Sequence, residues 1–354
     1  MAFTGTCAII SVLMNERSVE AMLVAILLFI LGFILLIKGG DWFVDGSTAL
    51  ARRLHIPEIV IGATVVAIGT TLPEVLVSAT GAISGHGGIA YGNAIGSVIC
   101  NTALISALTF AIRPCNVDIK SFIKPVIFFF AAALFYSLTA YLGGNFTRLT
   151  GIILLAVFVA YIAFTLFNAR ELTNQDTGLT VQKADEEKKE DQADELPLWK
   201  IIMMLVVGAA CIAVGANLLV ENGTKIAEAL GVPESVIALT FVALGTSLPE
   251  LVTAITALVK GHSALGLGNI VGANLFNLVL VSGLSTAIAP FNVYELGGKT
   301  IGNIPTSLAV EIPVMLFVML FMTLPALKNG KLTRAQGIIL LCLYAAFCIF
   351  QFTY

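Results

Sequence analysis

The stretch Pro57–Asn101 reads PEIVIGATVVAIGTTLPEVLVSATGAISGHGGIAYGNAIGSVICN, and a second copy of it follows 176 positions later in the chain. That copy, Pro233–Asn277, reads PESVIALTFVALGTSLPELVTAITALVKGHSALGLGNIVGANLFN. The two align without a gap, and 19 of the 45 aligned positions are identical. The identical pairs include Thr70/Thr246, Pro73/Pro249, Glu74/Glu250, Asn93/Asn269 and Asn101/Asn277. Each copy thus places one carboxylate inside an apolar run, where ionisable groups are rare and usually functional.

The composition indicates that these copies lie in a membrane. Hydrophobic residues make up 58% of the chain and charged residues 12%, and the mean hydropathy is +0.97. A soluble helical bundle would show a polar stripe along each helix, and these segments show none. Apolar stretches of about 20 residues can span a bilayer as helices. We expect ten, at residues 20–50, 57–84, 88–112, 122–143, 149–168, 198–229, 233–260, 264–289, 299–324 and 332–353. The fold class is therefore an all-α integral membrane protein with ten transmembrane helices.

The ten expected helices divide into two sets of five around one polar segment. Residues 169–197 carry a run of mixed charge and are expected to form a solvated linker. Because five is odd, the second copy enters the membrane from the side opposite to the first. The sequence thus predicts two inverted five-helix repeats, 1–168 and 198–354, with the duplicated segments extending over 57–112 and 233–289. Inverted repeats are typical of secondary transporters, which bind their substrate near the bilayer midplane.

Basic residues predict the orientation in the membrane. With the N-terminus outside, the short inner loops hold Arg52, Arg53, Arg113, Lys120, Lys124, Lys260, Lys328, Lys331 and Arg334. The outer side then holds only Arg17, Arg148, Lys225 and Lys299. We therefore expect a multi-pass cell-membrane protein with both termini outside and the linker in the cytoplasm. Residues 1–17 lack the charge order of a signal peptide.

The motif AIGTTLPE at 67–74, with ALGTSLPE at 243–250, predicts a cluster of oxygen ligands. Proline inside a helix lacks the N–H that would bond four residues back, so Pro73 is expected to break its helix and free the Gly69 carbonyl. Freed carbonyls at membrane depth are tolerated only when they are buried in protein or face a wet cavity. Thr70 and Thr71 lie on the helical face of Glu74. Carboxylates, hydroxyls and carbonyls are the ligands that Ca²⁺ prefers.

The second part of each copy, GNAIGSVICN and GNIVGANLFN, supplies close packing and amides. Its glycines have the GxxxG spacing that lets helices approach closely, and Asn101 lies one turn after Ser97. Two carboxylates with no basic residue in the repeat spans suit a divalent cation, because Ca²⁺ between Glu74 and Glu250 leaves a net charge near zero.

Other classes of function find little support. A net charge of −3 gives no basis for a nucleic-acid partner. The six cysteines have no metal or disulfide spacing and are expected to be buried apolar residues. The chain has no HExxH motif and no plausible Ser–His pair, so we expect no enzyme activity and no cofactor.

The motifs GTTLPE…GNAIGS…N and GTSLPE…GNIVGA…N closely resemble the paired α-repeats of cation/calcium exchangers, nearest the microbial sodium/calcium exchangers. The resemblance implies a ten-helix fold with clustered sites for one Ca²⁺ and up to three Na⁺, and a core across which the first and sixth spans slide. It implies Glu74 and Glu250 as the ligands shared by Ca²⁺ and Na⁺. The other implied ligands are Thr70, Thr71, Thr246 and Ser247, the carbonyls of Ala67 and Ala243, and, further out, Ser97, Asn101 and Asn277.

The chain departs from that pattern at two positions of the second copy. Ala273 stands where Ser97 supplies a hydroxyl in the first copy, so one Na⁺ position is expected to lose a ligand. Asn277 stands where potassium-dependent relatives have an acid, which argues against K⁺ cotransport. Proton-coupled relatives tend to carry an acid a few residues after the GN, and neither copy does.

Several charged residues have plainer interpretations. Asp41 and Asp45 follow the first hydrophobic stretch and are expected to be hydrated at a helix end. Glu58 and Glu234 suit helix N-termini, where the backbone dipole favours negative charge. His86 and His262 are expected in short turns, and Glu311 has no counterpart in the repeat.

The leading hypothesis is an electrogenic antiporter that exchanges Ca²⁺ for Na⁺ by alternating access. A Ca²⁺/H⁺ exchanger using the same glutamates is the nearest alternative. A cation channel is a third, although carboxylate rings in channels normally come from several identical subunits. The sequence leaves the oligomeric state open and is compatible with a monomer.

Overall fold

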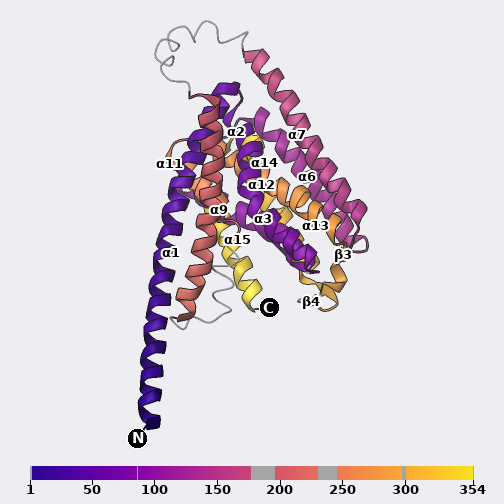
Figure 1. Cartoon of the computed structure of the whole chain (residues 1–354). Helices are drawn as coiled ribbons and strands as arrows, with labels where there is room; N and C mark the ends of the chain where they lie inside the picture. Colours follow the sequence, from indigo (N-terminus) through magenta and orange to yellow (C-terminus); the bar gives the residue numbers. More distant parts are fainter. Residues whose placement is uncertain (1, 86, 177–195, 230–244, 297–299, 354) are drawn as a thin grey trace.

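Long apolar helices make up nearly all of the chain in the computed structural model, which describes residues 2–85, 87–176, 196–229, 245–296 and 300–353 (Figure 1). Within these residues, nine helical segments are long and apolar enough to cross a bilayer. The expected span at 233–260 is described only from Gly245 onward and includes the short apolar helix α11, Leu248–Val259. Large apolar side chains on the outside, such as Leu23, Leu27 and Phe33, are more than half exposed, as lipid-facing side chains would be. The predicted all-α membrane architecture is confirmed.

The first half contains five helical spans. They are α1 (Ala2–Leu54); α2 (Glu58–Ile61) continued by the π-helix η1 (Gly62–Val66) and α3 (Ala67–Ile83); α4 (Gly87–Cys100) continued by the π-helix η2 (Asn101–Ser106) and α5 (Ala107–Ile112); α6 (Ile119–Tyr141); and α7 (Arg148–Asp176). Helix α7 therefore continues eight residues into the segment that we expected to be linker.

The second half repeats this order where it is described. It comprises α9 (Leu198–Ala229), α11, then α12 (Ser263–Phe276) continued by the π-helix η4 (Asn277–Val281) and α13 (Ser282–Ile288), then the π-helix η6 (Ser307–Glu311) continued by α14 (Ile312–Asn329), and α15 (Arg334–Thr353). Between α13 and η6 lie the 3₁₀ turn η5 (Val293–Glu295) and a hairpin of β4 (Thr300–Ile301) and β5 (Ile304–Pro305).

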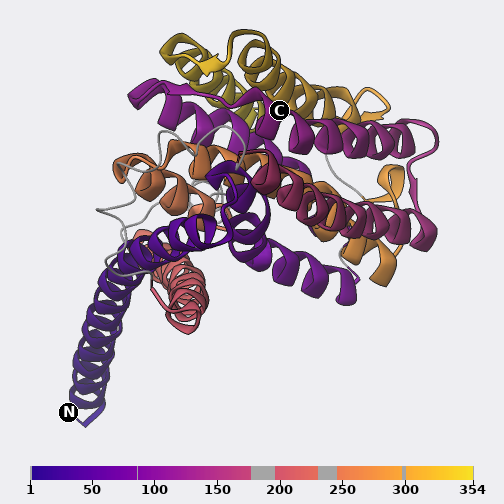
Figure 2. The ribbon, with the colours of Figure 1, turned by 90° about the horizontal axis from the view of Figure 1, so that it is seen from above.

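Helices α1 and α9 lie side by side at one edge of the molecule, apart from most other helices (Figures 1 and 2). They cross at four glycines. A Cβ on Gly32 would lie 2.9 Å from the Gly215 carbonyl oxygen, and a Cβ on Gly39 would lie 2.9 Å from that of Gly208. Gly32 and Gly208, and likewise Gly39 and Gly215, are 176 positions apart in the sequence. The crossing is therefore built from equivalent residues of the two repeats, as an internal twofold relation requires.

Two short strand pairs join the halves. β1 (Cys115–Asn116) pairs with β6 (Lys331–Leu332), and β3 (Phe291–Asn292) pairs with β2 (Asn145–Phe146). The strand after α5 thus pairs with a loop of the second half, and the strand after α13 pairs with a loop of the first. The N–H of Val117 donates to the Gly330 carbonyl and that of Val293 donates to the Gly144 carbonyl, each at 2.8 Å. These matched pairs support the inverted arrangement of the repeats.

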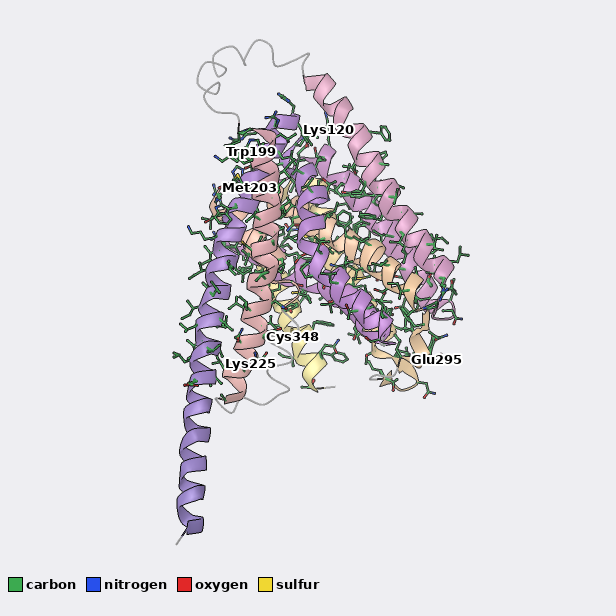
Figure 3. All side chains as sticks on the ribbon, in the orientation of Figure 1. Lys120, Trp199, Met203, Lys225, Glu295 and Cys348 are labelled. Carbon is green, nitrogen blue, oxygen red and sulfur yellow. The ribbon has the colours of Figure 1, made fainter. Side chains whose placement is uncertain are left out.

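Both termini lie at one end of the molecule, and the end of α7 and the start of α9 lie at the other (Figure 1). Lys120 and Trp199 are at the second end, whereas Lys225 and Glu295 are at the end that carries the termini (Figure 3). The relative sidedness of these segments agrees with an odd number of spans in each half.

The predicted break at Pro73 is wrong, because α3 runs through Pro73 to Ile83 without interruption. The irregular backbone lies earlier, in η1, where the hydroxyl of Tyr161 donates to the Ala63 carbonyl at 3.0 Å. In the second copy, α11 begins at Leu248 and places Pro249 in its first turn, where the missing N–H would have no partner in the helix anyway. The two copies therefore accommodate the same proline differently.

Candidate functional site

Two glutamates from opposite halves meet in the interior. Glu74 lies in the middle of α3, and Glu250 lies in the first turn of α11, a helix that contacts α3. Both side chains are fully buried. Glu250 lies close enough to Glu74 for the two charges to interact, and it lies beside the hydroxyls of Thr70 and Thr71. The inverted repeat thus brings its two buried carboxylates to one place.

Helix α3 presents one polar face to this place. Ala67, Thr70, Thr71 and Glu74 follow one another at helical spacing, and all four are buried. The side-chain oxygen of Thr71 and both carboxylate oxygens of Glu74 have no hydrogen-bond partner among the described residues. The same is true of both carboxylate oxygens of Glu250. Buried polar atoms are normally satisfied, so this cluster is chemically incomplete without a positively charged group.

The residues before α11 supply further hydroxyls. Ser247 is the N-cap of α11, and its buried side-chain oxygen has no partner in the described structure. Thr246 precedes it and is partly exposed. The first turn of a helix favours negative charge, which suits Glu250 in that turn. Ala243, whose carbonyl is an expected ligand, lies outside the described residues.

Two asparagines occupy equivalent backbone features. Asn101 is the first residue of η2 and Asn277 is the first residue of η4, and both are fully buried. None of their four amide atoms has a hydrogen-bond partner among the described residues. η2 contacts α11, the helix of Glu250, while η4 contacts α3, the helix of Glu74. Ser97 is buried in α4, one turn before Asn101.

The π-helical turns are a feature that sequence reasoning missed. Single π turns interrupt helices frequently at functional sites, because the extra residue changes the face on which side chains point. Two of the described π turns, η2 and η4, begin at the two expected asparagine ligands, 176 positions apart. The fixed offset of Asn101 and Asn277 was the available signal, but it does not reveal the local backbone geometry.

Two other asparagines, Asn93 and Asn269, also belong to this region, although they were not expected as site residues. The Thr70 hydroxyl donates to Oδ1 of Asn269 at 3.1 Å. The Thr246 hydroxyl donates to Oδ1 of Asn93 at 3.4 Å. Each bond joins one repeat to the other. The identity of Asn93 and Asn269 across the copies was the signal that could have identified them.

Glycines allow the close packing around the site. A Cβ on Gly272 in α12 would lie 2.6 Å from the Ala63 carbonyl oxygen, and a Cβ on Gly268 would overlap the Ile59 carbonyl. The predicted close approach is therefore confirmed for the second copy. For Gly92 and Gly96 in the first copy, no contact of this kind is described, and the residues equivalent to Ile59 and Ala63 lie in the segment 230–244 outside the description.

Asp41 and Asp45 are not at a helix end, contrary to expectation, because α1 continues to Leu54. The Lys260 ammonium lies 2.7 Å from Oδ1 of Asp45 and 3.3 Å from Oδ1 of Asp41. These acids belong to an ion pair between α1 and the end of α11, separate from the buried glutamates.

The remaining charged candidates are also outside the cluster. His262 is the N-cap of α12, and its Nδ1 lies 2.8 Å from a carboxylate oxygen of Glu58. Glu311 ends the π-helix η6 and accepts a hydrogen bond from the Gln351 amide at 3.0 Å. His86 and Glu234 lie outside the described residues.

The cluster has two acids and otherwise neutral oxygen groups. Among the described residues, no group of three or more His, Cys, Asp or Glu side chains lies close enough together to hold a metal ion by itself. Carboxylate, hydroxyl, amide and carbonyl oxygens are hard ligands, which suit Ca²⁺ and Na⁺ more than softer transition metals. Chemically, the two carboxylates can balance the charge of one Ca²⁺, and the neutral oxygens are further possible cation ligands.

Comparison with known proteins agrees with this chemistry. A family model described as "Sodium/calcium exchanger protein" matches residues 24–167 and 200–353. The sodium/calcium exchanger MaX1 of Methanosarcina acetivorans is 32% identical over 352 residues, covering 92% of this chain and 98% of its own length. A putative antiporter of Alkalimonas amylolytica, CaxA, is 33% identical over 333 residues, with the same two coverages.

A solved structure is similar over the same extent. The sodium-calcium exchanger NCX_Mj, in crystals soaked with Na⁺ and Sr²⁺, superposes with a TM-score of 0.74 at 32% identity. The match covers 92% of this chain and 98% of that one. It supports the predicted arrangement of ten helices in two inverted repeats.

Proposed function

The chain belongs to the sodium/calcium exchanger protein family, and from this premise we propose that it exchanges Ca²⁺ for Na⁺ by alternating access to a central site. It is a multi-pass membrane antiporter of cations that include Ca²⁺, it is not an enzyme, and it works without a cofactor.

The observation that carries the proposal is the pair Glu74 and Glu250. Their four oxygens are buried and have no hydrogen-bond partners among the described residues, and the two carboxylates are close enough for their charges to interact. Two carboxylates balance one Ca²⁺, and both halves of the inverted repeat contribute one. A site shared equally by two halves can be exposed to either side of the membrane when the halves change their relative position.

The proposed ligands surround this pair. Glu74 and Glu250 would bind Ca²⁺ and Na⁺ in turn, with the side-chain oxygens of Thr70, Thr71, Thr246 and Ser247 and the carbonyls of Ala67 and Ala243. Ser97, Asn101 and Asn277 would complete outer Na⁺ positions. The unpartnered side-chain atoms of Thr71, Ser247 and both asparagines support this set.

Sodium is the proposed counter-ion because the repeats carry neutral Asn, Ser and Thr oxygens around the carboxylates. Three Na⁺ against one Ca²⁺ would make the exchange electrogenic. Two protons in place of sodium would neutralise the same glutamates, so Ca²⁺/H⁺ exchange remains the competing function. The names of MaX1 and NCX_Mj specify sodium for those proteins and favour it here.

The proposed orientation places both termini outside and the 169–197 linker in the cytoplasm, with 1–168 and 198–354 as the two repeats. It rests on the distribution of basic residues. Introduced single cysteines at Lys225 and Lys331, tested with an impermeant thiol reagent, should react from outside and inside respectively, provided that native cysteines are first replaced.

The deciding experiment is calcium-45 uptake into proteoliposomes that contain the purified full-length chain. Outward gradients of Na⁺, K⁺ and H⁺ are imposed separately. Uptake driven by Na⁺ alone supports the proposal. Uptake driven by H⁺ and not by Na⁺ would replace it with the proton-coupled function.

A further inference from the structure

Two of the three threonines of the proposed site, Thr70 and Thr246, donate hydrogen bonds to asparagines of the opposite repeat. The Thr70 hydroxyl, buried in α3, lies 3.1 Å from Oδ1 of Asn269, which is fully buried in α12. A second acceptor, the Ala67 carbonyl, is more distant at 3.5 Å. Since a hydroxyl has one hydrogen, the nearer acceptor Asn269 receives it preferentially.

The second threonine repeats this contact. The Thr246 hydroxyl lies 3.4 Å from Oδ1 of Asn93 in α4. Thr70 and Thr246 are 176 positions apart, as are Asn93 and Asn269. The same bond is therefore formed twice, each time between repeats, although the surrounding sequence differs.

A hydroxyl group can bind a cation only through its oxygen lone pairs, so its hydrogen must point elsewhere. Glu250 lies near Thr70, so its carboxylate could also compete for that hydrogen. When a cation lies between Glu250 and Thr70, the hydrogen cannot point toward Glu250. The hydrogen then needs another acceptor, and Asn269 is nearer than the Ala67 carbonyl.

We propose that Asn269 is a positioning residue, which holds the hydroxyl hydrogen of Thr70 away from the transported cation. Asn93 does the same for Thr246. Neither asparagine needs to touch the ion. This inference rests on the proposed function, because it takes the two threonines to be cation ligands.

The two asparagines are anchored differently. The Asn93 amide donates to Oγ of Ser78 at 2.9 Å, which fixes its Oδ1 toward Thr246. The residue equivalent to Ser78 in the second repeat is Ala254, and Nδ2 of Asn269 has no partner among the described residues. Burial of Asn269 by close packing takes the place of that hydrogen bond.

The test is a pair of double-mutant cycles. For each variant, the Ca²⁺ concentration for half-saturation is measured in two assays, ion exchange and thermal stabilisation of the purified protein. Asn269→Ala should raise that concentration about three- to tenfold, as expected for one net hydrogen bond. Thr70→Val removes the ligand oxygen itself and should raise it further. Because Asn269 acts through Thr70, the double variant should lie within about twofold of Thr70→Val alone.

The chain supplies its own matched control. Combining Thr70→Val with Asn93→Ala breaks contacts in two separate pairs, so the two effects should multiply. The second cycle, Thr246→Val with Asn93→Ala, should again be non-multiplicative. This second cycle still tests the positioning role if the Asn269→Ala variant, altered at a fully buried position, does not fold. Ser78→Ala removes only the anchor of Asn93 and should change half-saturation by less than about threefold.

The outcomes distinguish failure of the proposed exchange function from failure of the positioning role of Asn269. If the wild type shows neither exchange nor stabilisation by Ca²⁺, the proposed function fails. In a second outcome, the wild type transports Ca²⁺ while the effects of Thr70→Val and Asn269→Ala on half-saturating Ca²⁺ multiply, as the effects in the crossed control pair do. That result would show a merely structural role for Asn269 and would overturn the positioning role. A Thr70→Val variant that behaves as wild type would also overturn it.

Discussion

Lys260, at the end of α11, forms an ion pair with Asp45 in α1, and 2.7 Å separates Nζ from Oδ1. Asp41, one turn earlier in α1, contributes a carboxylate oxygen at 3.3 Å and its backbone carbonyl at 3.3 Å. α1 packs mainly on α9, and this ion pair links α1 to the helix of Glu250. It therefore stabilises one position of α1 relative to α11.

Breaking this ion pair should change the balance between the two access states. Partly exposed ion pairs contribute up to about 1 kcal/mol, so Lys260→Gln should shift a two-state equilibrium by up to about fivefold. Half-saturating Ca²⁺ should then fall on one face of the membrane and rise on the other. The test is to measure the Ca²⁺ dependence of flux separately on each face of the protein in proteoliposomes. Lys328→Gln, at another lysine near a helix end, is the control. Equal values for Lys260→Gln and the control on both faces would contradict it.

Replacing Glu74 or Glu250 with Gln should abolish Ca²⁺ exchange while the protein stays folded. Each carboxylate supplies one of only two charges that balance Ca²⁺, and a neutral amide costs less to bury in a membrane than a charge. The measurement is calcium-45 flux together with Tm. Ca²⁺ should raise the Tm of the wild type and leave that of either variant unchanged, because only a bound ion stabilises the folded state. Wild-type flux in either variant would show that the site is elsewhere.

Exchange should depend on voltage. One Ca²⁺ leaves the two-glutamate site near neutral, whereas three Na⁺ leave it with about one positive charge. A membrane potential of about 100 mV acts on each moved charge with about 2.3 kcal/mol. Uptake driven by Na⁺ should therefore change when valinomycin and K⁺ set different potentials. A Ca²⁺ uptake rate that does not depend on the membrane potential would indicate that two monovalent ions exchange for each Ca²⁺.

Ala273→Ser should strengthen Na⁺ binding more than Ca²⁺ binding. Ala273 is fully buried in α12, one turn before Asn277, whose amide atoms have no described partner. The added hydroxyl restores what Ser97 supplies in the first repeat. The gain should be about 1 kcal/mol, near that of one net hydrogen bond, and should lower the Na⁺ concentration for half-maximal exchange. If titration of Na⁺-dependent flux gives the wild-type curve, position 273 does not line a sodium site.

Gly272→Ala should destabilise the protein. Its Cβ would lie 2.6 Å from the Ala63 carbonyl oxygen, and backbone on both sides must move to accommodate it. Overpacking of this kind costs about 1–3 kcal/mol. Gly266→Ala, in the same helix, would place its Cβ 3.4–3.6 Å from its nearest described neighbours, an ordinary contact distance, and serves as the control. A Tm for Gly272→Ala equal to that of the control would refute this.

The sequence predicted the features that follow from repetition and hydropathy. The 176-residue offset identified Glu74 and Glu250 as a pair, and the odd number of spans predicted that the two copies enter the membrane from opposite sides. Helical spacing correctly placed Thr70 and Thr71 on the face of Glu74. These conclusions depend on local periodicity and on comparison of the chain with itself.

Other features depend on contacts between distant segments, which no local pattern encodes. Lys260 and Asp45 are 215 residues apart, and Thr70 and Asn269 are 199 apart. The break expected at Pro73 failed for a different reason. Proline removes one hydrogen bond of a helix, but α3 continues through Pro73, and the irregular turn η1 ends before α3 begins.

The crossed strand pairs have a consequence for synthesis of the protein. Cys115 of the first half pairs with Leu332, and Asn145 pairs with Asn292. A ribosome completes all five spans of the first half long before it reaches either partner. Strands β1 and β2 of the first half therefore remain unpaired in the bilayer until their partners are synthesised. The β2–β3 pair at Asn292 can form before the β1–β6 pair at Leu332. Assembly can finish only when nearly the whole chain has left the ribosome.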